Sequence, residues 1–136
     1  MADATTTVGA LKAAAGAFAA ERHWEPFHTP KNLAMALACE VGELLEPFRW
    51  LTGDESLAAC RDPATRAAVA DELADVFNLL MLFSLHSGID VSEAVAQKLV
   101  KNEQKYPLGS DQSSVNSDQL SVEQRDRDGR SQASDD

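Results

Sequence analysis

The segment from Glu40 to Trp50, EVGELLEPFRW, combines a helical apolar pattern with closely spaced carboxylates. Val41, Leu44 and Phe48 recur at three- and four-residue spacing, as on the buried face of an amphipathic helix. Three acidic side chains interrupt this pattern: Glu40, Glu43 and Glu46. The function of the chain depends on whether these carboxylates are only solvated or hold a positively charged group.

Helical geometry separates the three carboxylates. Glu40 is predicted at the edge of the apolar face, and Glu43, three residues later, is its neighbour on the helix surface. Glu46 falls on the opposite side and is predicted to be solvated. Gly42 either leaves room for a close helix or ligand or is simply tolerated, and Pro47 is expected to kink the helix after the acidic pair.

A second acidic pair lies in the segment Asp71–Leu85, DELADVFNLLMLFSL. Glu72 and Asp75 are three residues apart and are therefore neighbours on one helix face. The residues after Asp75 are apolar almost all round the helix, which predicts that the rest of the bundle and another subunit cover it.

The two acidic pairs gain a function only if they converge, since each pair alone is most simply solvated. Two unit charges about 5 Å apart repel by roughly 3 kcal/mol at an effective dielectric constant of about 20. Four converging carboxylates would therefore have to protonate, diverge or bind a cation. Oxygen ligands without histidine or cysteine suit hard ions such as Mg²⁺ or Mn²⁺. A di-iron bundle would need Glu-x-x-His motifs, and neither pair supplies the histidine.

The wider pattern predicts an all-α fold of four helices, over about residues 8–21, 30–51, 63–88 and 90–106. Capping residues mark three of the starts: Thr29 before Pro30, Asp62 before Pro63, and Asp90 with Glu93 three residues later. The residues between Leu51 and Asp62 read as a connector. The sequence thus predicts one domain over residues 1–107, followed by a disordered tail over 108–136 that is rich in serine, aspartate and glutamine.

Composition limits the partners and the location of the chain. The 136 residues carry a formal net charge of −10, which argues against a nucleic-acid or anionic-membrane partner. No apolar run of about 18 residues is present, so no membrane span is expected. The start lacks a basic leader, and Cys39 and Cys60 show no metal-binding spacing. A reducing cytoplasm is the expected location.

The last predicted helix supplies groups that suit phosphate. Lys98, Asn102 and Lys105 are spaced four and three residues apart and share one helix face, beside Lys101. Ammonium and amide donors can bind phosphate oxygens. The alternative is an ordinary lysine-rich last turn that opposes the helix dipole.

The two tryptophans, Trp24 and Trp50, lie at predicted helix boundaries rather than within an apolar face. Core packing is the commoner role of tryptophan, but a boundary position leaves open stacking on a planar base. His28, just before the Thr29 cap, is placed either to donate to a ligand or to fix the loop.

These motifs together resemble a known family. The order of EVGE, DELAD and KNEQKYP is similar to the all-α nucleotide pyrophosphohydrolases of the MazG-like superfamily. The segment Glu21–Trp50, ERHWEPFHTPKNLAMALACEVGELLEPFRW, most resembles the dCTP pyrophosphatase branch. The similarity extends from about Leu11 to Pro107 and stops at the tail.

The resemblance implies a four-helix MazG-like bundle that forms a homodimer or a homotetramer built as a dimer of dimers. It implies a Mg²⁺-dependent enzyme that cleaves a deoxynucleoside triphosphate to the monophosphate and pyrophosphate. The metal would activate a water for attack on the α-phosphorus, so no covalent nucleophile is required.

The resemblance also implies roles for individual residues. The metal ligands and catalytic residues would be Glu40, Glu43, Glu72 and Asp75. The triphosphate would be held by Lys98, Asn102, Lys105 and Tyr106. The base pocket would be lined by Trp24, Trp50 and His28.

Three positions depart from the pattern expected of this branch. Ala15 and Leu79 occupy positions where polar or aromatic side chains are expected to face the base. A pocket without those groups is expected to recognise cytosine less strictly or to prefer a modified pyrimidine. His86 replaces an arginine expected near the phosphates, which would add pH sensitivity.

Two rival functions follow from the same sequence. One is a dUTP or dUDP hydrolase of the same superfamily, which differs in its substrate and products. The other is a non-catalytic helical module that uses its acidic face or tail to bind a basic partner.

Overall fold

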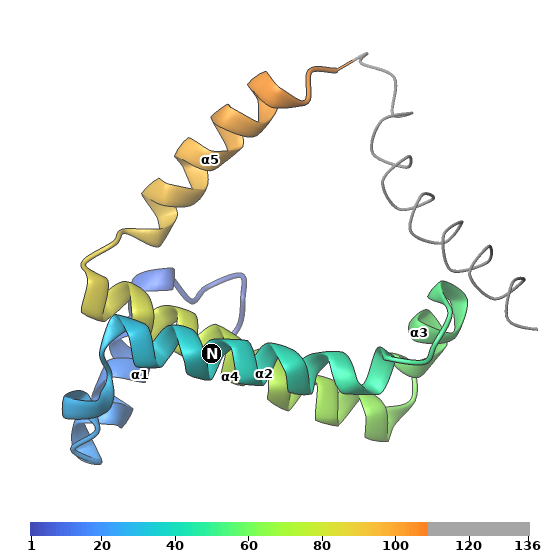
Figure 1. Cartoon of the computed structure of the whole chain (residues 1–136), viewed down its shortest axis with the longest axis horizontal. Coiled ribbons are helices and arrows are strands. Elements are labelled where there is room, and N and C mark those ends of the chain that lie inside the picture. The colour runs from blue at the N-terminus through green and yellow to red at the C-terminus, as the bar shows by residue number, and fades with distance from the viewer. Residues whose placement is uncertain (109–136) are drawn as a thin grey trace, which may run out of the picture. The chain divides into compact units, whose positions relative to one another are not determined.

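The computed structural model describes residues 1–108, and all of the regular structure within them is helical (Figure 1). The α-helices are α1 (Val8–Glu21), α2 (Pro30–Leu45), α3 (Gly53–Ala59), α4 (Pro63–Ser87) and α5 (Val91–Lys105). Two short 3-10 helices, η1 (Glu25–Phe27) and η2 (Glu46–Phe48), follow α1 and α2. The predicted all-α class is confirmed.

The chain divides into two compact units, residues 1–95 and a second unit that begins at Ala96. The first unit contains α1 to α4 and the first turn of α5, and the second contains the rest of α5. Apart from its first residue, the tail predicted over 108–136 lies outside the described residues. The domain boundary at residue 107 therefore stays a prediction.

Polar side chains cap the helices where the sequence predicts them. Thr29, Asp62 and Asp90 each accept a hydrogen bond from the backbone N–H three residues later, at 3.3, 2.9 and 3.0 Å. These oxygens satisfy amides that have no partner within the helix. At its other end α4 stops at Gly88, which adopts the left-handed conformation with φ of 69°.

The predicted second helix was too long, because α2 ends at Leu45 rather than near residue 51. Pro47 has no N–H with which to continue the α-helical ladder. The Glu46 N–H instead donates to the carbonyl of Glu43, and the chain continues as the 3-10 helix η2. Pro47 thus ends the α-helix just after the acidic pair rather than kinking it.

The predicted connector after residue 51 was wrong, since it contains the short helix α3. The Thr52 side chain accepts from the Glu55 N–H at 3.4 Å, and the Glu55 carboxylate accepts from the Thr52 N–H at 2.8 Å. This reciprocal capping box satisfies two amides at once. The signal was present in the sequence as threonine followed three residues later by glutamate.

The core forms where α4 packs against α2 and α1 (Figure 1). Ala19 from α1, Leu33 from α2 and Leu82 from α4 form a buried cluster. Gly16 permits the close approach of α1, because a Cβ atom at this position would lie only 2.9 Å from the Leu85 Cδ2 atom. α4 is therefore the central helix of the first unit.

The face of α2 that packs on α4 is rotated from the predicted one. Glu40 is half-buried, as are the neighbouring Ala36, Leu37 and Leu44. Val41, predicted in the buried stripe, is instead 40 % exposed. Glu40 thus lies within the packed face rather than at its edge.

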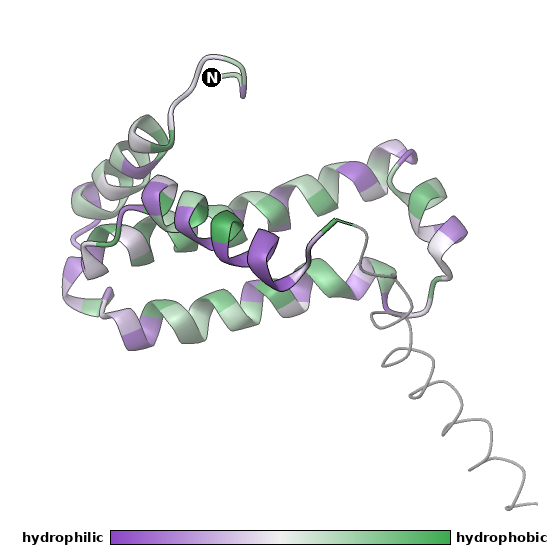
Figure 2. Cartoon of the chain, turned by 90° about the horizontal axis from the view of Figure 1, so that it is seen from above, coloured by the Kyte–Doolittle hydropathy of each residue, from purple (hydrophilic) through white to green (hydrophobic). Residues whose placement is uncertain are grey.

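Large apolar side chains remain exposed along α2 and α4. Figure 2 shows that hydrophobic residues, in green, recur along the helices among hydrophilic residues, in purple. On α4, Leu73, Phe77 and Leu80 follow one another at helical spacing and are 56, 39 and 42 % exposed. On α2, Val41 and Leu45 are 40 and 60 % exposed. In the described part of the chain, no helix is long and apolar enough to cross a membrane.

Replacing Leu33 by alanine is expected to lower the free energy of unfolding by about 2–5 kcal/mol, because it leaves a cavity in the core. Leu33 is only 2 % exposed. The matched control is Leu57→Ala on α3, which removes the same atoms from a side chain that is 62 % exposed. Urea unfolding followed by circular dichroism measures both changes. Equal losses in the two variants would contradict the assignment of the core.

Candidate active site

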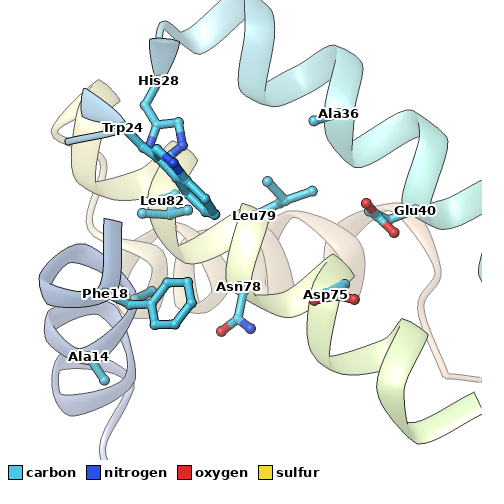
Figure 3. Close-up of a pocket in the computed structure, with 11 residues that line it drawn as sticks. Ala14, Phe18, Trp24, His28, Ala36, Glu40, Asp75, Asn78, Leu79 and Leu82 are labelled. Atoms are coloured by element: carbon cyan, nitrogen blue, oxygen red, sulfur yellow. The ribbon is translucent and has the colours of Figure 1, made fainter. Parts of the chain in front are cut away.

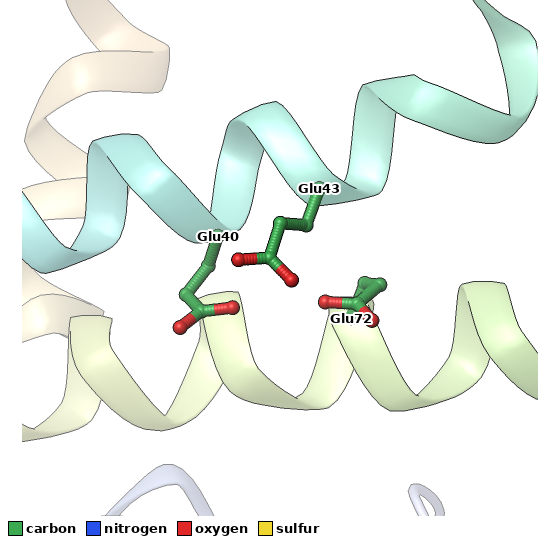
Figure 4. A group of neighbouring side chains, drawn as sticks. All are labelled: Glu40, Glu43 and Glu72. Atoms are coloured by element: carbon green, nitrogen blue, oxygen red, sulfur yellow. The ribbon is translucent and has the colours of Figure 1, made fainter.

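Three carboxylates from two helices converge in the first unit. Glu40 and Glu43 project from α2, and Glu72 projects from α4 toward them (Figure 4). Each residue offers one carboxylate oxygen, and these atoms all lie within 4.8 Å of one another. The predicted meeting of acidic side chains from two adjacent helices is confirmed for these three residues, which we call the acidic cluster.

Asp75, the fourth predicted ligand, lies beside the acidic cluster rather than within this close group. It is one turn after Glu72 on α4, and it lines a cavity together with Glu40 (Figure 3). Its charge is close enough to affect the titration of Glu40. All four predicted carboxylates therefore belong to one electrostatic neighbourhood.

The electrostatics of Glu40 reflect this crowding. Partial burial raises the pKa of Glu40, and the negative charges of Glu43, Asp75 and Glu72 raise it further. The two side-chain ion pairs within residues 1–108, Arg22–Glu21 and Arg49–Glu46, leave the acidic cluster without a neutralising side chain. A hard divalent cation fits this set of oxygen donors and would relieve the repulsion.

A cavity of about 450 Å³ extends from the acidic cluster between α1, α2 and α4 (Figure 3). Glu40 and Asp75 lie at one end, and Phe18, Trp24 and His28 lie at the other. The remaining lining residues are Ala14, Ala15, Ala36, Asn78, Leu79 and Leu82. One elongated cavity thus joins a charged end to an aromatic end.

The end of α1 places the aromatic residues. His23 adopts the left-handed conformation with φ of 55°, and the Trp24 N–H donates back to the Ala19 carbonyl at 3.1 Å. This Schellman-type reversal brings Trp24 against Phe18, with ring centroids 5.9 Å apart. The Arg22 guanidinium lies over the Phe18 ring at 3.4 Å.

His28 continues this aromatic group. Its ring lies 6.3 Å from Trp24 and 5.6 Å from His86, measured between centroids. The His28 Nδ1 atom is buried and has no hydrogen-bond partner within the described chain. Desolvation lowers the pKa of His28, the charge of His86 lowers it further, and Glu25 partly opposes both. His28 is therefore favoured in its neutral form.

Comparison with known proteins agrees with this geometry. The model of the MazG-like family matches residues 35–120. The chain belongs to the MazG-like family. Over 91 residues it is 44 % identical to dCTP pyrophosphatase 1 of Mus musculus, covering 67 % of this chain and 54 % of that protein. Over 90 residues it is 44 % identical to dCTP pyrophosphatase 1 of Homo sapiens, covering 66 % and 53 %. The chain thus spans about half the length of these relatives.

A solved structure supports the same family fold. The crystal structure of a pyrophosphatase from Archaeoglobus fulgidus matches this MazG-like chain with a TM-score of 0.65 and 39 % sequence identity. The match covers 68 % of this chain and 85 % of the archaeal one. The predicted relation to MazG-like proteins and to their dCTP pyrophosphatase branch is therefore confirmed.

Two further predicted site residues of the MazG-like chain lie apart from the acidic cluster. Trp50 is 83 % exposed beside Arg49, after η2, and it does not line the cavity of its own chain. His86 contacts His28 at the aromatic end. It is eleven residues from Asp75, about 16 Å along the helix axis. The roles of Trp50 near the base and of His86 near the phosphates stay predictions.

The predicted phosphate-binding residues lie in the second unit. Lys98, Asn102 and Lys105 follow one face of α5 by their spacing. The Lys105 ammonium lies 5.1 Å from the centroid of the Tyr106 ring. The roles of these four residues stay predictions.

Five lining residues of the cavity had no predicted site role: Ala14, Phe18, Ala36, Asn78 and Leu82. Phe18 is the aromatic residue among them, near the end of α1, and Asn78 is the polar residue within the apolar run of α4. Ala15 and Leu79, predicted to face the base, do line the cavity. Gly42, by contrast, has no atom within 4 Å of an added Cβ, so no described part of the chain requires a glycine there.

Replacing His86 by glutamine is expected to raise the pKa of His28, because it removes the second of the two effects that lower it. The pKa of His28 in the folded state lies below the ordinary histidine value of 6.5. The folded state therefore binds fewer protons than the unfolded state between those two pKa values, and stability falls as the pH falls through that window. This loss should be smaller in His86→Gln.

NMR titration of the histidine Hε1 signals measures this pKa directly. His23→Asn is the matched control, since it removes an imidazole that is not in the aromatic group and asparagine tolerates the left-handed conformation. An unchanged His28 titration in His86→Gln would contradict the coupling of the two rings.

Proposed function

We propose that the chain hydrolyses deoxynucleoside triphosphates to the monophosphate and pyrophosphate, with Mg²⁺ or Mn²⁺ as cofactor. The observation that carries this proposal is a cavity with Glu40 of the acidic cluster and Asp75 at one end and aromatic rings at the other. A nucleotide has the same polarity, with metal-binding phosphates at one end and a planar base at the other. The names of the relatives, dCTP pyrophosphatase 1, favour dCTP or a modified dCTP as substrate.

The four carboxylates are the proposed catalytic group. Glu40, Glu43, Glu72 and Asp75 would hold the divalent ion. When bound, the ion supplies the positive charge that polarises the phosphate and makes a water nucleophilic toward the α-phosphorus. The raised pKa of Glu40 supports this role, because crowded carboxylates favour either a proton or a cation. Glu43 is exposed and can therefore meet a solvated ion without moving the packed helices.

The base is proposed to enter the aromatic end of the cavity. Trp24 and Phe18 offer ring faces there, and His28 offers an imidazole whose buried Nδ1 atom has no partner in the described residues. Ala15 and Leu79 provide no hydrogen bond to the base, which supports relaxed recognition of cytosine or a preference for a modified pyrimidine. Trp50 is exposed and does not line this cavity, so we propose that it contacts the base of a nucleotide bound by a neighbouring subunit.

The α5 residues are proposed to bind the triphosphate. Lys98 and Lys105 are exposed ammonium groups, and Asn102 between them is half-buried. Tyr106 follows directly at the end of the helix. Their shared face and their donor chemistry support this role.

A homodimer or a dimer of dimers is proposed as the functional assembly. Within residues 1–108, the buried apolar side chains are Ala19, Leu33, Met81 and Leu82. Leu73, Phe77 and Leu80 recur at helical spacing and form one exposed apolar stripe on α4. A continuous stripe is expected of an interface rather than of scattered surface residues. A cytoplasmic location, expected from the two free cysteines, also stays a prediction.

The rival functions are separated by their products. A dUTP or dUDP hydrolase would release dUMP, together with pyrophosphate from dUTP or inorganic phosphate from dUDP. The proposed enzyme releases dCMP and pyrophosphate from dCTP. A non-catalytic acidic module would turn over no nucleotide and would bind a basic partner in a salt-sensitive manner. The aromatic rings that line one end of the cavity favour a small planar ligand over such a partner.

Replacing Glu43 by glutamine is expected to lower Mg²⁺-dependent release of pyrophosphate from dCTP by at least about 100-fold, because it removes a ligand charge without changing the shape of the side chain. Excess EDTA should abolish the activity of the wild-type protein. Coupled detection of pyrophosphate and chromatography of the nucleotide products give the measurement.

Glu46→Gln is the matched control for this variant. Glu46 is three residues from Glu43 but forms an ion pair with Arg49 at 3.5 Å instead of joining the acidic cluster. Its replacement should change the activity by no more than about twofold, as expected for a surface pair. Full activity of Glu43→Gln, or of the wild type in EDTA, would overturn the metal mechanism.

The double replacement Leu73→Glu and Phe77→Glu is expected to reduce the mass of the assembly, because it places two charges on the proposed interface. Sedimentation velocity at micromolar concentration measures this mass. Ala64→Glu is the matched control, since it adds a negative charge to the first turn of α4, where the helix dipole accommodates it. A wild-type protein that sediments as a monomer would refute the proposed assembly.

A further inference from the structure

The middle of the cavity contains one carboxamide in otherwise apolar surroundings. Between the acidic end and the aromatic end, the walls are formed by Ala14, Ala15, Ala36, Asn78, Leu79 and Leu82. Asn78 is the only side chain in this part of the lining that can donate or accept a hydrogen bond. Its position therefore determines which polar atom of a ligand can be recognised between the two ends.

Asn78 is available for a ligand. It is exposed, and within residues 1–108 its carboxamide makes no hydrogen bond to the chain. Figure 3 shows the amide between the Phe18 ring and the Asp75 carboxylate. Asparagine also forms helices less readily than the leucine that follows it, Leu79, so local helix stability does not explain its presence.

The order of groups along the cavity matches the order of groups in a nucleotide. Asp75 precedes Asn78 by three residues, about 4.5 Å along the axis of α4. Trp24 and His28 lie beyond Asn78 at the far end (Figure 3). In a deoxynucleotide the sugar lies between the phosphates and the base. A nucleotide with its phosphates at the acidic cluster and its base at the aromatic end thus has its sugar beside Asn78.

The deoxyribose offers one hydroxyl group in this position. Its 3′-hydroxyl can both donate and accept a hydrogen bond, and the carboxamide of asparagine offers a carbonyl acceptor and an amino donor. The neighbouring Leu79 and Ala36 side chains suit the carbon atoms of the sugar ring. We propose that Asn78 recognises the 3′-hydroxyl of the substrate sugar and is thereby a specificity-determining residue of this site.

This inference rests on the proposed function, because it assumes a nucleotide in the cavity with its phosphates at the acidic cluster. It goes beyond that function by assigning a sugar contact to a residue that the base pocket and the acidic cluster do not use. It also predicts that recognition through Asn78 is independent of the identity of the base.

The test is a double-mutant cycle between the protein and the substrate. Asn78→Leu removes the carboxamide with little change in volume, and 2′,3′-dideoxycytidine triphosphate removes the hydroxyl. With dCTP, Asn78→Leu is expected to lower kcat/KM about tenfold, as for the loss of a hydrogen bond of about 1.4 kcal/mol. With thymidine triphosphate, kcat/KM of Asn78→Leu should fall by about the same factor. With the dideoxy substrate, kcat/KM should not change, since the 3′-hydroxyl group that Asn78 binds is already absent.

Two results would overturn the inference. If the fall in kcat/KM depends on the base and persists with the dideoxy substrate, Asn78 contacts the base. If the fall in kcat/KM is equal for all substrates, the dideoxy substrate included, Asn78 acts on the acidic end of the cavity or on the structure of α4. Thermal unfolding of Asn78→Leu shows whether the fold itself has changed.

A binding measurement separates this inference from the proposed function. The wild-type protein and Asn78→Leu are titrated with deoxycytidine monophosphate and with its 2′,3′-dideoxy analogue, and binding is measured by isothermal titration calorimetry. A tenfold preference for the 3′-hydroxyl that disappears in Asn78→Leu supports the inference, and equal affinities refute it. A wild-type protein that releases no pyrophosphate from any deoxynucleoside triphosphate refutes the proposed function, whatever the binding shows.

Discussion

The mutual repulsion of carboxylates on α2 and α4 is the constraint on which the site depends. These helices pack against each other through apolar side chains such as Leu33 and Leu82. The same packing carries Glu40, Glu43 and Glu72 to within a few ångströms of one another. Because the apolar contacts and the carboxylates lie on the same pair of helices, moving the helices apart to separate the charges would expose the core. Within the packed helices, a proton or a cation relieves the repulsion that raises the pKa of Glu40.

This arrangement gives the cavity one charged end and one aromatic end. α2 and α4 lie side by side and supply the charged end, whereas the reversal after α1 supplies the aromatic end. The two ends are thus set by different structural devices, helix packing in one case and the helix terminus at His23 in the other. A change in the loop after α1 can alter the fit of a base without moving the acidic cluster. A shift of α4, by contrast, affects both ends.

Helical periodicity and capping chemistry made most of the fold predictable from the sequence. Thr29, Asp62 and Asp90 act through contacts three residues away, so the start of each helix is encoded locally. The acidic cluster was predictable for a related reason, since two pairs at helical spacing beside apolar stripes can converge only if their helices are adjacent. The missed helix α3 had an equally local signal, the capping box of Thr52 and Glu55, in a segment predicted to be a connector.

The remaining features depend on contacts between distant segments, which spacing alone does not define. The packed face of α2 includes Glu40 and excludes Val41 because α4 covers only one side of the helix. The place of Trp24 depends on the unusual backbone conformation of His23, to which the sequence pattern assigned no role. Asn78 interrupts an apolar run, but its importance is visible only once α1 and α2 enclose the space beside it.

The exposed stripe on α4 connects the proposed assembly to the chemistry of the site. Leu73 follows Glu72 directly and Phe77 lies two residues after Asp75, along a helix of 25 residues that is apolar on several sides. α1 and α2 cover only part of such a helix. A second subunit that packs on this stripe would also remove water from the neighbourhood of the carboxylates. Lower local polarity strengthens both their repulsion and their attraction to a cation. Assembly and metal binding are then expected to stabilise each other through α4.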